Sequence, residues 1–145
     1  DYENRRRRIH PRGLRRRTVS KISRHSLSAV INFVVTDQDI DDIMSAVLDG
    51  GITYWCCRAE VVGDYLGEYA SEQISRGGTL RLHDSEADSV YELTLDKFLN
   101  GVRLWIENER AFTLTDAGQL DTGDIDALAA DMIIQYALFS DVIYG

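Results

Sequence analysis

The sequence predicts a small α+β domain, with helices packed on one face of a mostly antiparallel sheet of about three strands, preceded by a disordered basic N-terminal tail. Apolar residues recur at helical spacing in several segments, which indicates amphipathic helices. Residues 79–83 and 89–93 instead alternate apolar and polar side chains, as the two strands of a hairpin do. A chain of 145 residues is long enough to bury one core, so we expect one folded domain.

Charge divides the chain into two parts. Residues 1–28 carry ten basic and two acidic side chains, a net charge of +8, whereas residues 29–145 carry six basic and 22 acidic side chains, a net charge of −16. A segment so rich in arginine and so poor in large apolar residues buries too little surface to fold alone. We therefore expect a disordered tail over residues 1–28 and a single acidic α+β domain over residues 29–145.

Three interpretations of the basic tail are open. It is a nucleic-acid arm whose arginines neutralise phosphates, a solvated tail that lies partly on the acidic domain, or a segment outside the native product. The third interpretation follows from the lack of an initial Met and from the abrupt start of domain-like sequence near Val30. The arm would bind through Arg5, Arg6, Arg7, Arg8, Arg12, Arg15, Arg16 and Arg17.

The clearest helix is predicted over residues 37–49, after a short edge strand at residues 31–35. Thr36 occupies the N-cap position, and acidic residues in the first turn favour the helix dipole. Gly50 and Gly51 end the helix, because glycine accepts the left-handed conformation that often follows a helix. The apolar stripe of the helix consists of Ile40, Ile43, Met44, Val47 and Leu48.

Residues 52–60 fit both a strand and one face of a helix. We favour a strand, because β-forming residues such as Tyr54 and Trp55 dominate its first half and a double glycine precedes it. The neighbouring residues Cys56 and Cys57 would then point to opposite sides of the strand, one into the core and one towards the surface.

Helical spacing returns after residue 62 and predicts a second helix that ends at Gly77 and Gly78. Gly63 and Gly67 destabilise such a helix by about 1 kcal/mol each. The face of this helix would carry Tyr65, Leu66, Tyr69 and Ala70.

The hairpin formed by residues 79–83 and 89–93 is followed by a helix that Thr94 caps. The apolar stripe of this helix is Leu95, Phe98, Leu99, Val102 and Ile106, with Trp105 beside it. Residues 109–123 are predicted as a loop that contains a short strand at residues 111–114.

The last helix is predicted to begin near Asp124, with Thr122 or Gly123 at its cap. Residues 141–144 after it would add a terminal strand. The predicted buried face of this helix is Ile125, Leu128, Ala129, Met132, Ile133 and Tyr136.

No motif in the sequence predicts catalysis, a metal or a cofactor. Residues 37–48 superficially resemble a calcium loop, but Asp42 stands where the loop needs Gly and Leu48 stands where it needs Glu. The tripeptide at residues 121–123, Asp-Thr-Gly, occurs in aspartic proteases, whose chemistry needs two paired carboxylates and a mostly β dimer. Predicted helices on both sides of the tripeptide favour a helix cap instead. We therefore predict a protein that is not an enzyme.

Aromatic residues are the candidates for a protein-binding surface. Tyr and Trp supply large contact areas at interfaces, although they lie more often in the core. The candidate residues are Tyr54, Trp55, Tyr65 and Tyr69.

Four runs within residues 35–145 carry a resemblance to a known type of protein. They are Asp39-Ile40-Asp41-Asp42-Ile43, Gly50-Gly51-Ile52-Thr53-Tyr54-Trp55-Cys56, Ser75-Arg76-Gly77-Gly78-Thr79-Leu80 and Gln135-Tyr136-Ala137-Leu138-Phe139. On these runs the chain resembles a type of small protein carried by phages and mobile elements of gut Firmicutes. The resemblance implies no activity and no site residues, but it supports a tail over residues 1–28 that lies outside the domain proper.

These observations together predict a non-catalytic binding protein, an accessory factor of a phage or mobile element that inhibits or adapts a host protein. An acidic domain suits a protein partner with a basic surface, and exposed aromatic residues would make a homodimer reasonable. The alternative is a nucleic-acid-associated protein that binds through its Arg-rich arm. The sequence shows no membrane span and no signal peptide, and two adjacent cysteines favour a reducing compartment. The predicted location is therefore the cytoplasm of a bacterial host.

Overall fold

The computed structural model describes residues 22–145, of which residues 33–145 form one compact unit. The arginines of the predicted nucleic-acid arm, residues 5–17, lie outside the described residues. The edge strand predicted at residues 31–35 is absent, since residues 22–36 contain neither helix nor strand. Phe33 and Val35 instead pack their side chains against the core, where the ring of Phe33 meets that of Phe112 edge-on at 5.2 Å.

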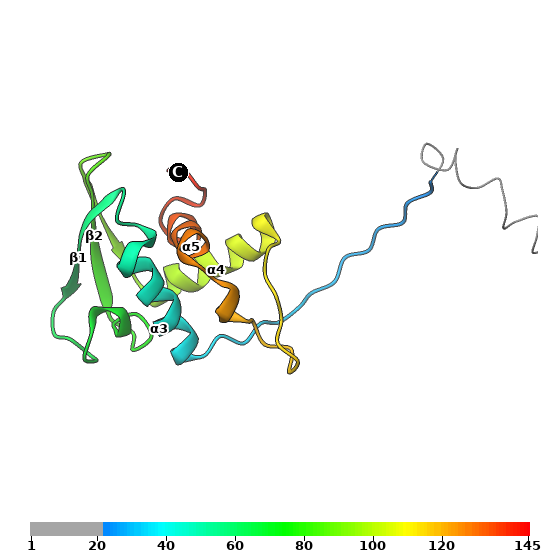
Figure 1. Ribbon diagram of the computed structural model, residues 1–145, viewed down its shortest axis with the longest axis horizontal. Coiled ribbons are helices and arrows are strands. Elements are labelled where there is room, and N and C mark those ends of the chain that lie inside the picture. Colours follow the sequence, from blue (N-terminus) through cyan, green and yellow to red (C-terminus); the bar gives the residue numbers. More distant parts are fainter. Residues whose placement is uncertain (1–21) are drawn as a thin grey trace, which may run out of the picture. The chain divides into compact units, whose positions relative to one another are not determined.

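The compact unit is an α+β domain with a three-stranded antiparallel sheet, which confirms the predicted fold class. The elements in chain order are α3 (Asp37–Ala46), η1 (Val47–Gly51), β1 (Cys56–Val62), η2 (Ala70–Glu72), β2 (Thr79–Asp84), β3 (Ser89–Leu93), α4 (Leu95–Glu109), η3 (Thr122–Asp124) and α5 (Ala127–Phe139). The strand order is β1-β2-β3, so that β2 lies in the centre. Figure 1 shows α3, α4 and α5 on one side of the sheet.

Helix α3 begins as the sequence predicts. The Thr36 hydroxyl accepts a hydrogen bond from the Asp39 N–H at 3.1 Å, and the Asp39 carboxylate accepts one from the Thr36 N–H at 3.0 Å. This reciprocal capping box satisfies two N–H groups that would otherwise lack partners. The helix continues as one wider turn, η1, through Gly51. A Cβ on Gly51 would lie 3.0 Å from the carbonyl oxygen of Ala127, so glycine allows η1 to approach the start of α5.

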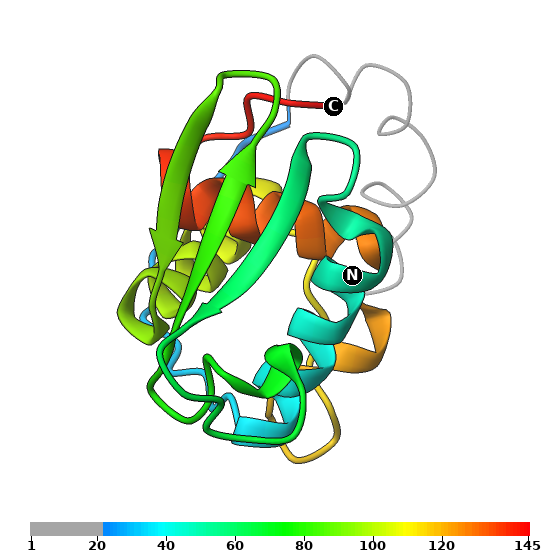
Figure 2. The same ribbon diagram turned by 90° about the vertical axis from the view of Figure 1, so that its left-hand side faces the viewer.

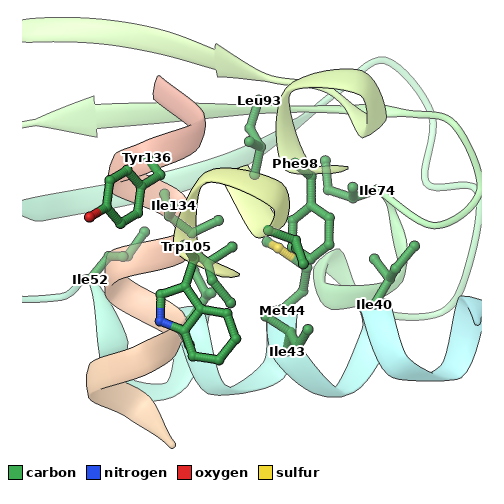
Figure 3. Packing of buried hydrophobic residues seen from close by; sticks show 14 of the residues in the cluster. Ile40, Ile43, Met44, Ile52, Ile74, Leu93, Phe98, Trp105, Ile134 and Tyr136 are labelled. Atoms are coloured by element: carbon green, nitrogen blue, oxygen red, sulfur yellow. The ribbon is translucent and has the colours of Figure 1, made fainter. Parts of the chain in front are cut away.

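The core lies between the sheet and the helices. Ile40, Ile43 and Met44 of α3 are buried, as the apolar stripe predicts. Figure 3 shows Met44 beside Phe98 of α4, with labelled side chains from the other elements converging on the same region. Leu99 was predicted to join the buried stripe of α4, but it is exposed. No helix within residues 22–145 has the length and the apolar character needed to cross a bilayer.

The predictions for the segments around β1 are correct only in part. The strand favoured over a helix for residues 52–60 is formed, but as β1 it begins only at Cys56. Residues 52–55 form a turn rather than the start of a strand, because the N–H groups of Trp55 and Cys56 both donate to the Ile52 carbonyl, at 3.1 and 2.8 Å. The helix predicted after residue 62 is not formed either, and only the short 3₁₀ turn η2 interrupts the loop of residues 63–78. Gly63 adopts a φ of +79°, a left-handed conformation that ends regular structure at this point.

The last helix starts later than predicted, and its buried face is largely as predicted. Ile125, Ile133 and Tyr136 are buried, and Ala129 and Met132 pack partly buried against the core. Asp126 caps α5 by accepting a hydrogen bond from the Ala129 N–H at 2.9 Å, whereas Thr122 and Gly123 belong to η3. Leu128 was predicted to be buried but is 68% exposed. The buried residues of α5 are Ala130, Asp131, Ile133, Ile134, Gln135 and Tyr136.

The short strands predicted at residues 111–114 and 141–144 are also absent. Leu114 forms only an isolated bridge with Leu120, and residues 141–144 contain no strand. The second of these segments nevertheless packs on the core through Val142 and Tyr144.

Candidate functional site

The four aromatic residues predicted to form a protein-binding surface lie at opposite ends of β1. Tyr54 and Trp55 precede the strand, whereas Tyr65 and Tyr69 follow it in the loop of residues 63–78. The strand has seven residues and therefore separates the two pairs by roughly 20 Å, at about 3.3 Å per residue. Figure 2 shows the turn before β1 and the loop after it at opposite ends of the sheet. The predicted surface is therefore divided in two.

Trp55 does not belong to the surface, and its assignment as a contact residue is wrong. Its side chain is fully buried, its ring stacks on that of Tyr144 at 5.3 Å, and its indole N–H donates to Asp131 at 2.8 Å. Trp55 is instead a core residue, the more common position of such aromatic side chains.

The loop of residues 63–78 displays three large side chains to solvent. Tyr65 is 59% exposed, Leu66 is 49% exposed and Tyr69 is 61% exposed. We call these three residues the aromatic patch. An apolar side chain that stands alone on a surface needs no explanation, but three such side chains within five residues of one loop form a candidate contact surface.

Buried and half-buried polar side chains fix the backbone beneath the aromatic patch. Gln73 is buried, and its side-chain oxygen accepts from the Leu66 N–H at 3.0 Å while its amide group donates to the Asp64 carbonyl at 3.1 Å. The Glu72 carboxylate accepts from the N–H groups of Glu68 and Tyr69, at 2.7 and 3.2 Å. These two hydrogen bonds lower the pKa of Glu72, so the carboxylate stays charged at neutral pH.

The end of the same loop is fastened to α3. The Ser75 hydroxyl donates to the Asp41 carboxylate at 2.6 Å, and the guanidinium of Arg76 lies 3.8 Å from the same carboxylate. Ile74, which directly precedes Ser75, is fully buried. Contacts therefore fix both the first and the second half of the loop, and the backbone that bears the aromatic patch has a fixed conformation.

The aromatic patch has an acidic border. Asp64 and Glu68 are exposed within the same loop, and Arg76 is the only basic residue of residues 63–78. The compact unit as a whole carries 22 acidic and six basic side chains, because residues 29–32 are uncharged. A partner for this surface would thus need an apolar centre and a basic rim.

A second cluster of polar groups lies at the other end of β1, around the carboxylate of Asp131. One of its oxygens accepts from the Trp55 indole and from the Gln135 amide at 3.0 Å, and the other accepts from the Tyr54 hydroxyl at 2.6 Å. Burial and the hydrogen bond to Asp131 raise the pKa of Tyr54 to about 12. Asp131 and Gln135 are almost completely buried.

Asp84 forms a comparable cluster at the end of β2. Its carboxylate accepts from the hydroxyl groups of Tyr144 and Tyr91, at 2.7 and 3.1 Å, and from the N–H groups of Glu86 and Ala87. Burial alone would raise the pKa of Asp84, but these hydrogen bonds outweigh burial and hold the pKa below its usual value. Within residues 22–145 both buried carboxylates are satisfied by neutral donors rather than by cations.

The outer face of the sheet carries a row of charged side chains. The Glu60 carboxylate accepts a hydrogen bond from His83 at 2.7 Å and lies 3.2 Å from the guanidinium of Arg58 and 3.9 Å from that of Arg81. Arg81 also meets Glu92 across the hairpin at 3.3 Å. Arg58 and Glu60 share β1, whereas the other pairs join neighbours on adjacent strands, so cross-strand stabilisation of the sheet accounts for those pairs.

The Asp-Thr-Gly tripeptide lies at the turn η3, and the two neighbouring cysteines differ in burial. Asp121 accepts a hydrogen bond from the Gly123 N–H at 3.0 Å and so closes the turn η3. Cys56 is buried and Cys57 is exposed, as predicted, and burial raises the pKa of the Cys56 thiol. In the described part of the chain, no group of three or more His, Cys, Asp or Glu side chains is arranged to hold a metal ion.

Comparisons with protein-family models, with curated proteins and with solved structures found no match to this chain.

Proposed function

We propose that residues 33–145 form a non-catalytic protein-binding domain and that the aromatic patch is its contact surface. The partner is a protein with an apolar centre and a basic rim. One observation carries the proposal, namely that Tyr65, Leu66 and Tyr69 are exposed on a loop whose backbone is fixed by buried hydrogen bonds.

The fixed backbone supports a binding role because it lowers the cost of association. A flexible loop loses conformational freedom when it binds, whereas a pre-organised loop has already lost it on folding. Gln73 and Glu72 orient the backbone of the patch without covering its side chains. Tyrosine is also among the residues that contribute most to binding energy when they fill the centre of an interface.

The acidic border would favour partners whose contact surface carries basic residues. Complementary charges around an apolar centre accelerate association and exclude partners of like charge. Asp64 and Glu68 would face basic residues on the partner, and the net charge of −16 would steer such a surface towards the domain.

The test compares three full-length proteins as baits in extracts of bacterial hosts, followed by affinity measurement with each purified partner. They are the wild type, the variant Tyr65→Ala/Tyr69→Ala, and the control Val90→Ala/Leu128→Ala, which shortens two exposed apolar residues outside the loop. We expect a partner that binds the wild type and the control equally and binds the tyrosine variant about 30-fold more weakly, as loss of about 2 kcal/mol implies. Equal binding to all three proteins, or no specific partner for the wild type, would reject the proposal.

Nucleic-acid binding through the arginines of residues 5–17 is the second candidate function. Its support is the net charge of +8 on residues 1–28, in contrast to the acidic remainder of the chain. The two functions use different parts of the chain, so each can be tested without the other.

The resemblance to phage and mobile-element proteins adds a biological setting to the proposal. In that setting the partner is a protein in the cytoplasm of a bacterial host, which the domain inhibits or adapts. A homodimer formed through the aromatic patch is the competing use of the same surface, and sedimentation of the wild type and the Tyr65→Ala/Tyr69→Ala variant distinguishes the two.

A further inference from the structure

The segment after α5 lies across the second polar cluster as a strap. The strap consists of residues 140–145. Ser140 ends α5 in a left-handed conformation, with φ of +60°, and the following residues have no regular structure. In Figures 1 and 2 the strap turns back from the end of α5 towards the end of the β2–β3 hairpin.

Gln135 binds the backbone of the strap with one buried side chain. Its oxygen accepts from the N–H groups of Ile143 and Tyr144, both at 2.8 Å, and its amide group donates to the Tyr144 carbonyl at 3.2 Å. Three backbone groups of two consecutive residues are thus recognised by one side chain. Because the N–H groups of two consecutive residues converge on one oxygen, the backbone turns at this point, since successive N–H groups of an extended chain point in opposite directions. Recognition of this kind depends on the backbone conformation and not on which side chains the segment carries.

Asp84 and Trp55 recognise the side chain of Tyr144. The Tyr144 ring stacks on Trp55 and meets Phe139 at 6.0 Å, and its hydroxyl donates to Asp84 at 2.7 Å. Both the ring and the hydroxyl group of Tyr144 therefore have partners in the domain. Ile143, in contrast, is 53% exposed, so the domain holds the side chain of Tyr144 but not that of the residue before it.

The groups that hold the strap all come from other elements of the domain. They are contributed by the turn before β1, the end of β2 and the helix α5. The hydrogen bonds of Gln135 and Asp84 to the strap reach only Ile143 and Tyr144. Because none of these contacts depends on the covalent link to α5, an equivalent segment of another protein would make the same contacts.

We propose that Asp84, Trp55 and Gln135 form a binding site for a peptide segment that contains a tyrosine and turns there as the strap does, and that the strap is the occupant supplied by the chain itself. The ligand is a protein segment with free backbone N–H and C=O groups around the tyrosine. This site lies at the end of β1 opposite the aromatic patch, and it does not depend on the function proposed for that patch.

The test measures binding of the peptide acetyl-Asp-Val-Ile-Tyr-Gly-amide to full-length proteins by calorimetry and by tryptophan fluorescence, to which Trp55 contributes. The Tyr144→Ala variant weakens the occupant in the chain, and we expect it to bind the peptide at least about tenfold more tightly than the wild type does. Circular dichroism establishes that the variant is folded. Leu128→Ala, an exposed change on α5, serves as the control and should bind as the wild type does.

Two altered peptides test the chemistry of recognition without altering the protein. A peptide with Phe in place of Tyr lacks the hydroxyl that reaches Asp84, and we expect about tenfold weaker binding, the size of one hydrogen bond to a charged acceptor. A peptide methylated on the tyrosine nitrogen lacks one donor to Gln135 and should also bind at least about tenfold more weakly. Equal binding of all three peptides overturns the proposal.

The proposal also fails if folded Tyr144→Ala binds the peptide no better than the wild type does. Should that variant not fold, Tyr144→Phe keeps the ring and loses only the hydroxyl, and it must then bind the tyrosine peptide more tightly than the wild type does. If the strap variants instead alter self-association and leave peptide binding unchanged, the site takes the strap of a second copy, and the separate peptide ligand is rejected.

Discussion

Replacement of Gly101 with alanine should destabilise the domain, because α4 and α5 touch at this residue. A Cβ at Gly101 would lie 2.5 Å from the carbonyl oxygen of Ile133, 2.7 Å from the Cβ of Ala137 and 2.9 Å from the nitrogen of Ala137. Two of these atoms are backbone and the third is attached to it, so no side chain can rotate away. Helix α5 must therefore move, and its buried residues must move with it.

The magnitude follows from two opposing effects. Alanine is about 1 kcal/mol more favourable than glycine within a helix, whereas overpacking of a core costs about 1–3 kcal/mol. Three contacts under 3 Å place Gly101 at the upper end of that range, which leaves a net loss of about 2 kcal/mol. For a domain of this size the melting temperature should fall by roughly 8 °C.

Urea unfolding monitored by tryptophan fluorescence measures this loss, since Trp55 and Trp105 are both buried. Asn100→Ala, a change at the neighbouring exposed position, is the control and should alter stability by less than about 0.5 kcal/mol. If Gly101→Ala is as stable as the wild type or more stable, α4 and α5 do not approach each other as described.

Two further predictions concern pH and salt. The pKa values of Tyr54, Tyr136 and Tyr144 are raised from 10.0 to about 12, so the stability linked to these hydroxyl groups is complete below pH 10 and is lost as the pH rises towards 12. Denaturant titrations between these pH values should show that loss, reduced in Tyr136→Phe, and a flat profile would contradict it. Replacement of Arg5 to Arg8 by Gln in the full chain should weaken any binding to duplex DNA and reduce its dependence on salt, whereas Arg103→Gln should change neither. Equal salt slopes for the wild type and the arginine variant would rule out the arm.

The sequence was most informative where local and tertiary preferences agree. Helix α3 combines a capping residue, Thr36, with an apolar stripe that is buried as predicted. The hairpin of β2 and β3 follows its alternating pattern in the same way, with Leu80, Leu82 and Leu93 in the core. In such elements the pattern itself identifies the buried face.

The pattern failed where the distribution of apolar residues was ambiguous. Helix α5 is apolar nearly all round, so periodicity identified only part of the buried face. Ile133 and Tyr136 are buried as predicted, whereas Leu128 was assigned to that face wrongly. Asp131 and Gln135, four residues apart, were the informative positions, because two polar residues in an apolar helix indicate buried partners. These partners are supplied by Tyr54, Trp55 and the strap, which no local pattern reveals.

The loop that bears the aromatic patch shows a different limit of sequence reasoning. Tyr65, Leu66 and Tyr69 have helical spacing, yet the backbone is fixed by the side chains of Glu72 and Gln73. Hydrogen bonds from side chain to backbone compete with regular helix formation, and glycine residues favour the irregular form. The prediction that Tyr65 and Tyr69 lie on the surface agrees with their exposure, although the helix that was to display them is absent.

The Asp131 cluster also bears on the order in which the domain folds. Its hydrogen bonds to Tyr54 and Trp55 join residues 77 and 76 positions apart in the chain, so a long loop must close before they form. The reciprocal cap of α3 and the hairpin need no such closure. We therefore expect the cluster to form late, after the main folding barrier. Substitutions at Asp131 should then accelerate unfolding and leave the folding rate nearly unchanged, so that this cluster sets how long the folded domain persists.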